Sequence, residues 1–215
     1  MKNLVIGITF ILLLTILSGC FGDDPTELMY EQLETSVQIE NEMESLQEPL
    51  VEAEKKEIQL YNDMAGLSSI EEIEPLSQKA IESAESRRSI MEEEKDFFDN
   101  AFEAFQAAEQ YVEDLEEDQA KEAGRTLIDI QNERKSVYEE LYTEYVSSID
   151  EDIKLFEMVV DEESQNDELE GQQEKVNESY ARITELSDQF NALLNDFNEA
   201  KVIFYESVGF NVTTK

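Results

Sequence analysis

The stretch ITELSDQFNALLNDFNEAKVIF, residues 183–204, decides the fold, because apolar residues return in it every seven positions. The full series starts further upstream and consists of Leu169, Val176, Ile183, Phe190, Phe197 and Phe204. Such a repeat places its members along one side of an α-helix and is typical of helices that pack in a left-handed bundle. We therefore predict a long helix here, with Phe190 and Phe197 in the core and Gly209 as its natural end.

Similar apolar spacing predicts three further helices before this one. They should cover residues 26–64, the region from Ser69 to the acidic stretch 113–118, and residues 119–160. Pro49 lacks a backbone donor, so we expect the first helix to kink near Leu46. Two patterns of the capping-box type, Ser69-x-x-Glu72 and Asp167-x-x-Glu170, should start the second and the last helix.

Polar residues interrupt the apolar series at several positions. These interruptions include Glu57, Arg87, Glu94, Arg134, Ser148, Gln173, Ser187 and Lys201. Lys201 stands between two phenylalanines of the repeat, so we expect it to pair with a nearby carboxylate.

The predicted fold class is all-α, in the form of an elongated antiparallel four-helix up-and-down bundle. Short connections between long helices favour antiparallel neighbours. The bundle should form one domain over residues 26–209, followed by a tail at 210–215. The stretch 113–118 contains no Gly or Pro to force a turn. If it stayed helical, the chain would form a three-helix, spectrin-like bundle, which is the alternative.

Charge is the strongest feature of the composition. The 215 residues include 53 acidic and 16 basic ones, which gives a formal net charge of −37. Disorder is a concern at such a charge, but 40% of the residues are hydrophobic and follow a clear period. We expect a folded domain with an acidic exterior. Such a surface repels nucleic acid and anionic bilayers, so nucleic acid is not expected as a partner.

The residues that most enzymes rely on are missing from this sequence. The chain contains no His, one Cys and seven Gly, so the commonest general base and the Ser-His and Cys-His arrangements are excluded. We predict no enzyme, and no catalytic, cofactor-binding or metal-binding residues. A hydrolase of the cell wall that uses two carboxylates stays an alternative. A solute-binding receptor is the other, although strand patterning is absent.

The N-terminal residues have the layout of a secretion signal. Lys2 gives a positive start, residues 4–17 are mostly apolar, and the small residues Ser18 and Gly19 precede Cys20. The apolar run is shorter than the ~18 residues of a membrane-spanning helix. This layout resembles a bacterial lipoprotein signal, with residues 1–19 as signal peptide and 20–25 as lipidated tether. An uncleaved helix or an ordinary secretion signal is the alternative.

The lipoprotein resemblance assigns a chemical role to Cys20. Its thiol would carry a diacylglyceryl group, and cleavage would fall between Gly19 and Cys20. The two acyl chains of this group make the anchor stable, whereas a single acyl chain binds membranes only marginally. The expected location is the extracytoplasmic face of the cell membrane.

The whole chain resembles one family. The residues that carry the resemblance are Leu17-Ser18-Gly19-Cys20, Tyr180, Phe190-Asn191, Phe197-Asn198, Lys201-x-x-Phe204-Tyr205 and Gly209. In these features and in its acidic helical body the chain is similar to the cell-wall-binding lipoproteins of Gram-positive bacteria called the YkyA family. The resemblance implies an extracytoplasmic helical bundle without an established enzymatic activity. Only Cys20 receives a defined role from it.

The predicted function is therefore that of a membrane-tethered, non-enzymatic binding or spacer module of the cell envelope. Its partners would be the membrane, through the lipid on Cys20, and either wall polymer or another envelope protein. Tyr138, Tyr142 and Tyr145 share one helix face. They offer two interpretations: stacking on sugar rings of the wall, or a bundle boundary with the hydroxyls reaching water, which we favour.

Overall fold

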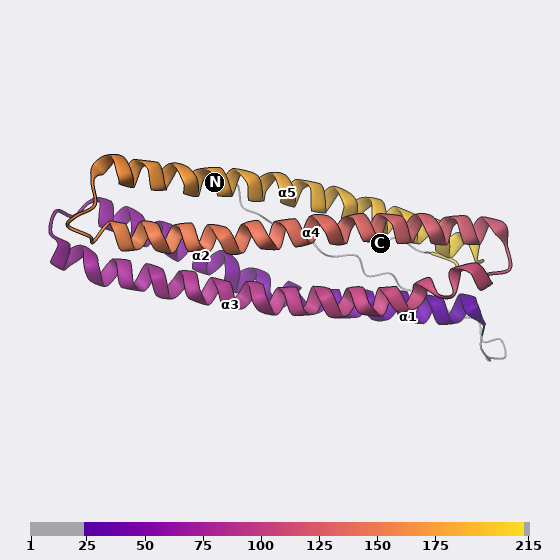
Figure 1. Ribbon diagram of the computed structural model, residues 1–215. Helices are drawn as coiled ribbons and strands as arrows, with labels where there is room; N and C mark the ends of the chain where they lie inside the picture. Colours follow the sequence, from indigo (N-terminus) through magenta and orange to yellow (C-terminus); the bar gives the residue numbers. More distant parts are fainter. Residues whose placement is uncertain (1–23, 213–215) are drawn as a thin grey trace. The chain divides into compact units, whose positions relative to one another are not determined.

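The computed structural model describes residues 24–212, which form helices and no strand (Figure 1). The elements are α1 (Pro25–Glu42), α2 (Glu44–Ala65), α3 (Ile70–Glu109), the short 3₁₀ helix η1 (Val112–Asp114), α4 (Asp118–Met158) and α5 (Asn166–Ser207). The predicted all-α class and the helical bundle are confirmed. Residues 1–23 and 213–215, and with them Cys20, lie outside the described part.

The helices contribute to two compact units, which we describe separately. Within the described residues, unit 1 comprises 24–44, 97–138 and 188–212, and unit 2 comprises 45–96 and 139–187. Unit 1 contains α1, and unit 2 contains all of α2 except its first residue. The helices α3, α4 and α5 each contribute a segment to both units, so each unit is built from four helical segments.

The first predicted helix is two helices in the structure. α1 ends at Glu42, and α2 begins at Glu44. At Met43 the backbone N–H bonds to the carbonyl of Glu40 at 3.0 Å, which is the tighter spacing of a 3₁₀ turn. Pro49 lies inside α2, so the interruption comes earlier in the chain than the kink predicted near Leu46.

The acidic stretch after α3 leaves the helix, so the three-helix alternative is wrong. α3 ends at Glu109, and α4 begins only at Asp118. Between them, Val112 and Leu115 are buried in the core of unit 1. Burial of these two apolar side chains holds the non-helical segment against the core, although the segment contains neither Gly nor Pro.

The predicted capping boxes form differently from the expectation. Ser69 precedes α3 and its carbonyl accepts from Glu72 and Ile73, but its hydroxyl bonds to the carboxylate of Glu71. α5 begins at Asn166, before the predicted cap at Asp167.

The cap of α5 is shifted toward the N-terminus, and its end is where the sequence predicts it. The N–H of Gln165 donates to Oε2 of Glu168 at 3.1 Å, which is the backward half of a capping box. The helix ends at Ser207, and Gly209 has a φ of +84°, a conformation that favours glycine.

Unit 1 has an aromatic core. Phe190 is 2% exposed and Phe197 is 4% exposed, so their predicted core positions are confirmed. Phe98 lies 6.0 Å from Phe190, and Phe105 lies 5.9 Å from Phe197, as measured between ring centroids. One continuous cluster joins the start of α1, the end of α3, η1, the start of α4 and the end of α5. These ends therefore lie together within unit 1.

Unit 2 has a smaller apolar cluster at the connections between its helices. Leu60 and Met64 from the end of α2 pack with Ala80 of α3 and Phe156 of α4. Ile73 from the first turn of α3 and Val159, just after α4, lie against the same cluster. The start of α3 and the ends of α2 and α4 therefore meet at one end of unit 2. The up-and-down order of the whole chain stays a prediction.

Candidate functional site

The site predicted from sequence, Cys20, lies outside the described residues and stays a prediction. No helix within residues 24–212 is long and apolar enough to cross a membrane. The same residues contain no group of three or more His, Cys, Asp or Glu side chains placed to hold a metal ion. In this part of the chain, two clusters around buried arginines, one buried lysine with its partner, and a surface groove are the features that could take part in binding or chemistry.

The first polar cluster lies in unit 2 and is centred on Arg87, which is fully buried. Arg87 Nη2 lies 2.5 Å from Asp152 Oδ2 and 3.2 Å from Glu57 Oε2. Arg87 Nη1 donates to the hydroxyl of Tyr180 at 2.6 Å, and that hydroxyl donates to Asp152 at 2.8 Å. We call these four residues and Tyr145 the Arg87 cluster. It joins α2, α3, α4 and α5.

Tyrosine rings cover the remaining sides of Arg87. The centre of its guanidinium lies 5.4 Å from the ring centroid of Tyr145 and 5.9 Å from that of Tyr180. The hydroxyl of Tyr145 donates to Glu54 at 2.5 Å. Burial raises the pKa of both tyrosines, so they stay neutral hydrogen-bond donors at ordinary pH.

Glu57 is the member of the Arg87 cluster whose pKa is shifted toward neutrality. Burial raises the pKa of its carboxyl to about 7, against the pull of Arg87 and with added repulsion from Asp152. Its Oε1 accepts no hydrogen bond from the described protein atoms. The carboxyl therefore changes its protonation state near neutral pH, inside the protein.

The second polar cluster lies in unit 1 and is centred on Arg134 of α4, which is also fully buried. Its two terminal nitrogens bind the two oxygens of Glu40 on α1 at 2.7 and 2.8 Å. The guanidinium lies 4.7 Å from the ring centroid of Phe190 and 5.7 Å from that of Phe197. The Arg134 cluster thus combines a bidentate ion pair with cation–π contacts.

Lys201, also in unit 1, is buried and pairs with a partly exposed carboxylate. Its Nζ lies 3.6 Å from Glu34 Oε1, and the hydroxyl of Tyr205 donates to the same carboxylate at 2.6 Å. The predicted partnership of Lys201 with a carboxylate is confirmed. Burial lowers the pKa of Lys201, and Glu34 and Glu40 oppose this effect.

Four of the interruptions of the apolar repeat, Glu57, Arg87, Arg134 and Lys201, are thus places where charge is buried and paired. The sequence marks Glu57, Arg87 and Arg134 as such positions, but their partners come from other helices and were not identified from the pattern.

The structure also shows where two of the three tyrosines that share a helix face lie. Tyr138 and Tyr145 are buried, and Tyr138 stacks on Phe98 with 3.8 Å between ring centroids. These two tyrosines are therefore unavailable for stacking on sugars.

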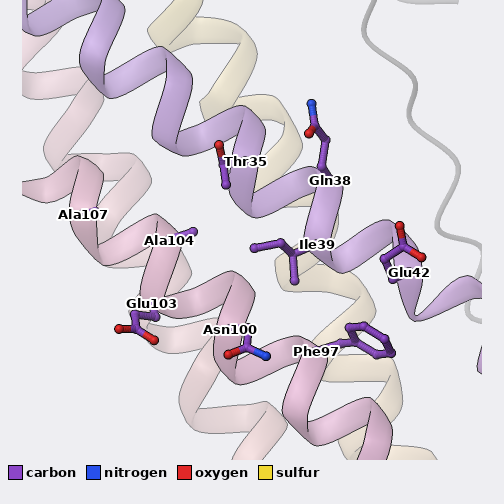
Figure 2. Close-up of a pocket in the computed structure, with 9 residues that line it drawn as sticks. All are labelled: Thr35, Gln38, Ile39, Glu42, Phe97, Asn100, Glu103, Ala104 and Ala107. Carbon is purple, nitrogen blue, oxygen red and sulfur yellow. The ribbon is translucent and has the colours of Figure 1, made fainter.

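A surface groove of about 700 Å³ lies between α1 and α3 in unit 1 (Figure 2). The residues that line it on α1 are Thr35, Gln38, Ile39 and Glu42. Their spacing of three and four residues places them along one broad side of the helix. Ile39 points from α1 toward α3 in Figure 2.

The α3 side of the groove combines one aromatic residue with small and polar ones. Its residues are Phe97, Asn100, Glu103, Ala104 and Ala107. The nine lining residues include no Lys and no Arg. The sequence does not predict this groove, because the apolar pattern of one helix does not show which face of another helix lies opposite it.

Comparisons with known proteins agree with the helical architecture. Residues 24–207 match the model of the YkyA family, which is described as "Putative cell-wall binding lipoprotein". The "Uncharacterized lipoprotein YkyA" of Bacillus subtilis (strain 168) is 30% identical over 199 residues, which are 92% of this chain and 89% of the relative.

A solved structure shows the same fold. It is a conserved protein of unknown function from Staphylococcus aureus, with a TM-score of 0.56 and 16% sequence identity. The match covers 85% of this chain and 96% of that chain. At this identity the likeness concerns the fold alone. The family match spans nearly all of the described residues, and on this ground the chain belongs to the YkyA family.

Proposed function

We propose that the chain is a non-enzymatic helical module of the cell envelope that is tethered to the membrane by a lipid on Cys20 and contacts the cell wall. The observation that carries the proposal is the extent of the family match. It covers residues 24–207, which include all the helices of the structure. This extent supports the helical body as the part of the chain that would contact the wall.

The buried carboxylates favour binding over hydrolysis. A glycosidase places two carboxyl groups on either side of a substrate in an open cleft. Glu57 and Asp152 converge instead on Arg87 in the interior of unit 2, and both are buried. The open groove of unit 1 does carry two carboxylates, Glu42 and Glu103, but both are exposed, so neither has the apolar surroundings that prepare a carboxyl to act as a general acid. The family description indicates no enzyme.

The anchoring part of the proposal is tested at Cys20. Cys20→Ala should prevent lipidation, so that either an unprocessed precursor stays in the membrane or protein without a lipid is shed into the medium. Cys20→Ser is the closer control, because it keeps a small polar side chain and still lacks the thiol. Membrane fractionation and mass spectrometry of the N-terminus read the result. Normal processing and retention of both variants would contradict the anchor.

The wall-binding part is tested by sedimentation with purified cell wall. The full-length chain, kept in a polyoxyethylene detergent, should sediment with wall fragments of the producing organism and be released by excess soluble wall digest. An acidic helical protein of similar charge serves as the control for non-specific adsorption. A chain that stays in the supernatant at all salt concentrations would contradict the proposal.

A further inference from the structure

The groove of unit 1 exists because small residues stand on α3. Ala104 and Ala107 are half-buried and end in methyl groups, which leave room beside α1. Figure 2 shows Ile39 of α1 pointing toward α3, so that Ile39 and the two alanines give the groove an apolar floor. A leucine at either alanine would fill this room with little change to the aromatic core beneath.

Polar groups and one ring complete the groove. Phe97 stands half-buried at one end, near Glu42. α1 and α3 each bring one exposed amide, Gln38 and Asn100. An amide offers two donors and an acceptor, and a carboxylate offers only acceptors. An apolar floor with a few polar groups around it is the usual composition of a site for a small or extended ligand.

The charge of the groove selects among the components of a cell wall. The chain carries a formal net charge of −37, and the lining residues include two glutamates and no cation. An anionic wall polymer would therefore be repelled. An uncharged sugar fits better, because its apolar ring face can lie on Phe97 and its hydroxyls can donate to Glu42 and Glu103. Acetamido groups can pair with the amides.

We propose that the groove between α1 and α3 binds the uncharged glycan of the cell wall, as sugar rings with hydroxyl and acetamido groups, and not its anionic polymers. This inference rests on the proposed function and names the ligand class. The floor of Ile39, Ala104 and Ala107 receives the apolar ring faces. The amides and carboxylates at the edge form hydrogen bonds with the hydroxyl and acetamido groups.

The test compares groove variants of the full-length chain with a matched control. Ala107→Leu fills the groove, and Phe97→Leu keeps an apolar side chain but removes the ring. Ala192→Leu makes the same change at an exposed alanine of α5 in unit 1, outside the groove. The probes are wall fragments before and after acid removal of anionic polymers, and the β-linked tetrasaccharide of N-acetylglucosamine.

We expect the wild type to bind the stripped wall at least as well as the untreated wall. Ala107→Leu should weaken binding to the stripped wall and to the tetrasaccharide at least roughly tenfold, the loss of one or two good contacts. Phe97→Leu should weaken it less, and Ala192→Leu should stay within about twofold of the wild type. Circular dichroism checks folding, and Ala104→Leu replaces Ala107→Leu if the latter does not fold.

The contrary outcomes are distinct. If the groove variants bind the stripped wall like the wild type, the groove is not the site, although wall binding itself stands. If binding disappears when the anionic polymers are removed, the choice of an uncharged glycan is wrong. If the wild type binds neither wall preparation, the proposed function fails, and the groove inference fails with it.

Discussion

The two buried arginines, Arg134 in unit 1 and Arg87 in unit 2, are neutralised and surrounded in different ways. Both are fully buried at positions that interrupt an apolar repeat. In unit 1, Arg134 binds both oxygens of Glu40 and lies over the ring of Phe190. In unit 2, one nitrogen of Arg87 is shared by Glu57 and Asp152, and its neighbours are tyrosines.

The difference shows how the number of carboxylates around an arginine controls protonation. A guanidinium and one bidentate carboxylate form a neutral pair. Two carboxylates at Arg87 leave one negative charge in excess, in a place where water cannot compensate it. Taking up a proton on Glu57 removes this excess, in line with its raised pKa of about 7. The stability of unit 2 should therefore depend on pH near neutrality.

Loss of Arg87 should have the largest effect. Arg87→Met removes the cation that Glu57 and Asp152 share, and breaking a buried ion pair from one side costs about 3–5 kcal/mol. We expect the upper end of this range at pH 8, where both carboxylates are charged. Chemical denaturation gives the free energy of unfolding, and hydrogen exchange shows whether α2 and the other segments of unit 2 open first.

The matched control for this prediction neutralises the whole cluster. Arg87→Met combined with Glu57→Gln and Asp152→Asn should recover most of the lost stability, because no buried charge then lacks a partner. Arg134→Met should instead accelerate exchange in unit 1. If Arg87→Met alone costs less than about 1 kcal/mol, the paired charges of unit 2 do not matter for its stability.

Phe197 tests the aromatic core of unit 1. Phe197→Ala should cost about 3–5 kcal/mol through lost burial and a cavity. The substitution also removes the ring that faces Phe105 and Arg134. Hydrogen exchange should increase first in unit 1. Phe197→Leu, which keeps most of the apolar volume, should cost clearly less, and equal losses for the two variants would argue against tight packing at this position.

The change in stability with pH should be somewhat smaller than the losses expected for Arg87→Met and Phe197→Ala. Glu57 has a folded-state pKa of about 7 and an ordinary value of 4.5. Because burial favours its protonated form, the contribution of this group is fully present below about pH 4.5 and is lost as the pH rises through 7. The shift corresponds to roughly 3 kcal/mol at most. Stability should fall between pH 5 and pH 8.

Glu57→Gln isolates this effect, because other carboxylates titrate alike in both proteins. The variant keeps the shape of the side chain and cannot ionise. Its advantage in unfolding free energy over the wild type should grow from pH 5 to pH 8, chiefly in unit 2. A constant difference across this range would mean that Glu57 does not titrate there.

Salt should change the stability less than loss of Arg87, truncation of Phe197 or a change of pH. Repulsion within a chain of net charge −37 is screened as the Debye length falls from ~10 Å at 0.1 M to ~3 Å at 1 M NaCl. The melting temperature should rise by a few degrees, and Mg²⁺ at equal ionic strength should act as a diffuse counterion. A saturable, stoichiometric change at micromolar Ca²⁺ would instead show a specific metal site.

The sequence predicts the helices and the core well, because both follow from local periodicity. Phe190 and Phe197 recur at the spacing of one helix face, and Gly209 ends the helix in the conformation that glycine favours. The kink in the first predicted helix was expected near Leu46, but the helix is interrupted earlier, at Met43. The position of Pro49 alone therefore does not determine where the tighter turn forms.

Tertiary pairing explains what the pattern did not show. The sequence marks Arg87 as an interruption, but only packing brings Glu57, Asp152 and Tyr180 to it from three other helices. The groove has the same origin, because Ala104 and Ala107 leave space only relative to the face of α1 that stands opposite. The signal for Cys20 is local and readable, and it lies outside the described residues.

The most direct test of the excess charge in unit 2 is an NMR titration of Glu57. The side-chain carboxyl carbon can be followed from pH 4 to 9 in ¹³C-labelled protein and assigned with Glu57→Gln. The arrangement around Arg87 predicts a midpoint near 7. A midpoint near the ordinary value of 4.5 in the folded protein would contradict the excess charge. It would mean that burial and the neighbouring Asp152 do not disfavour the ionised form of Glu57.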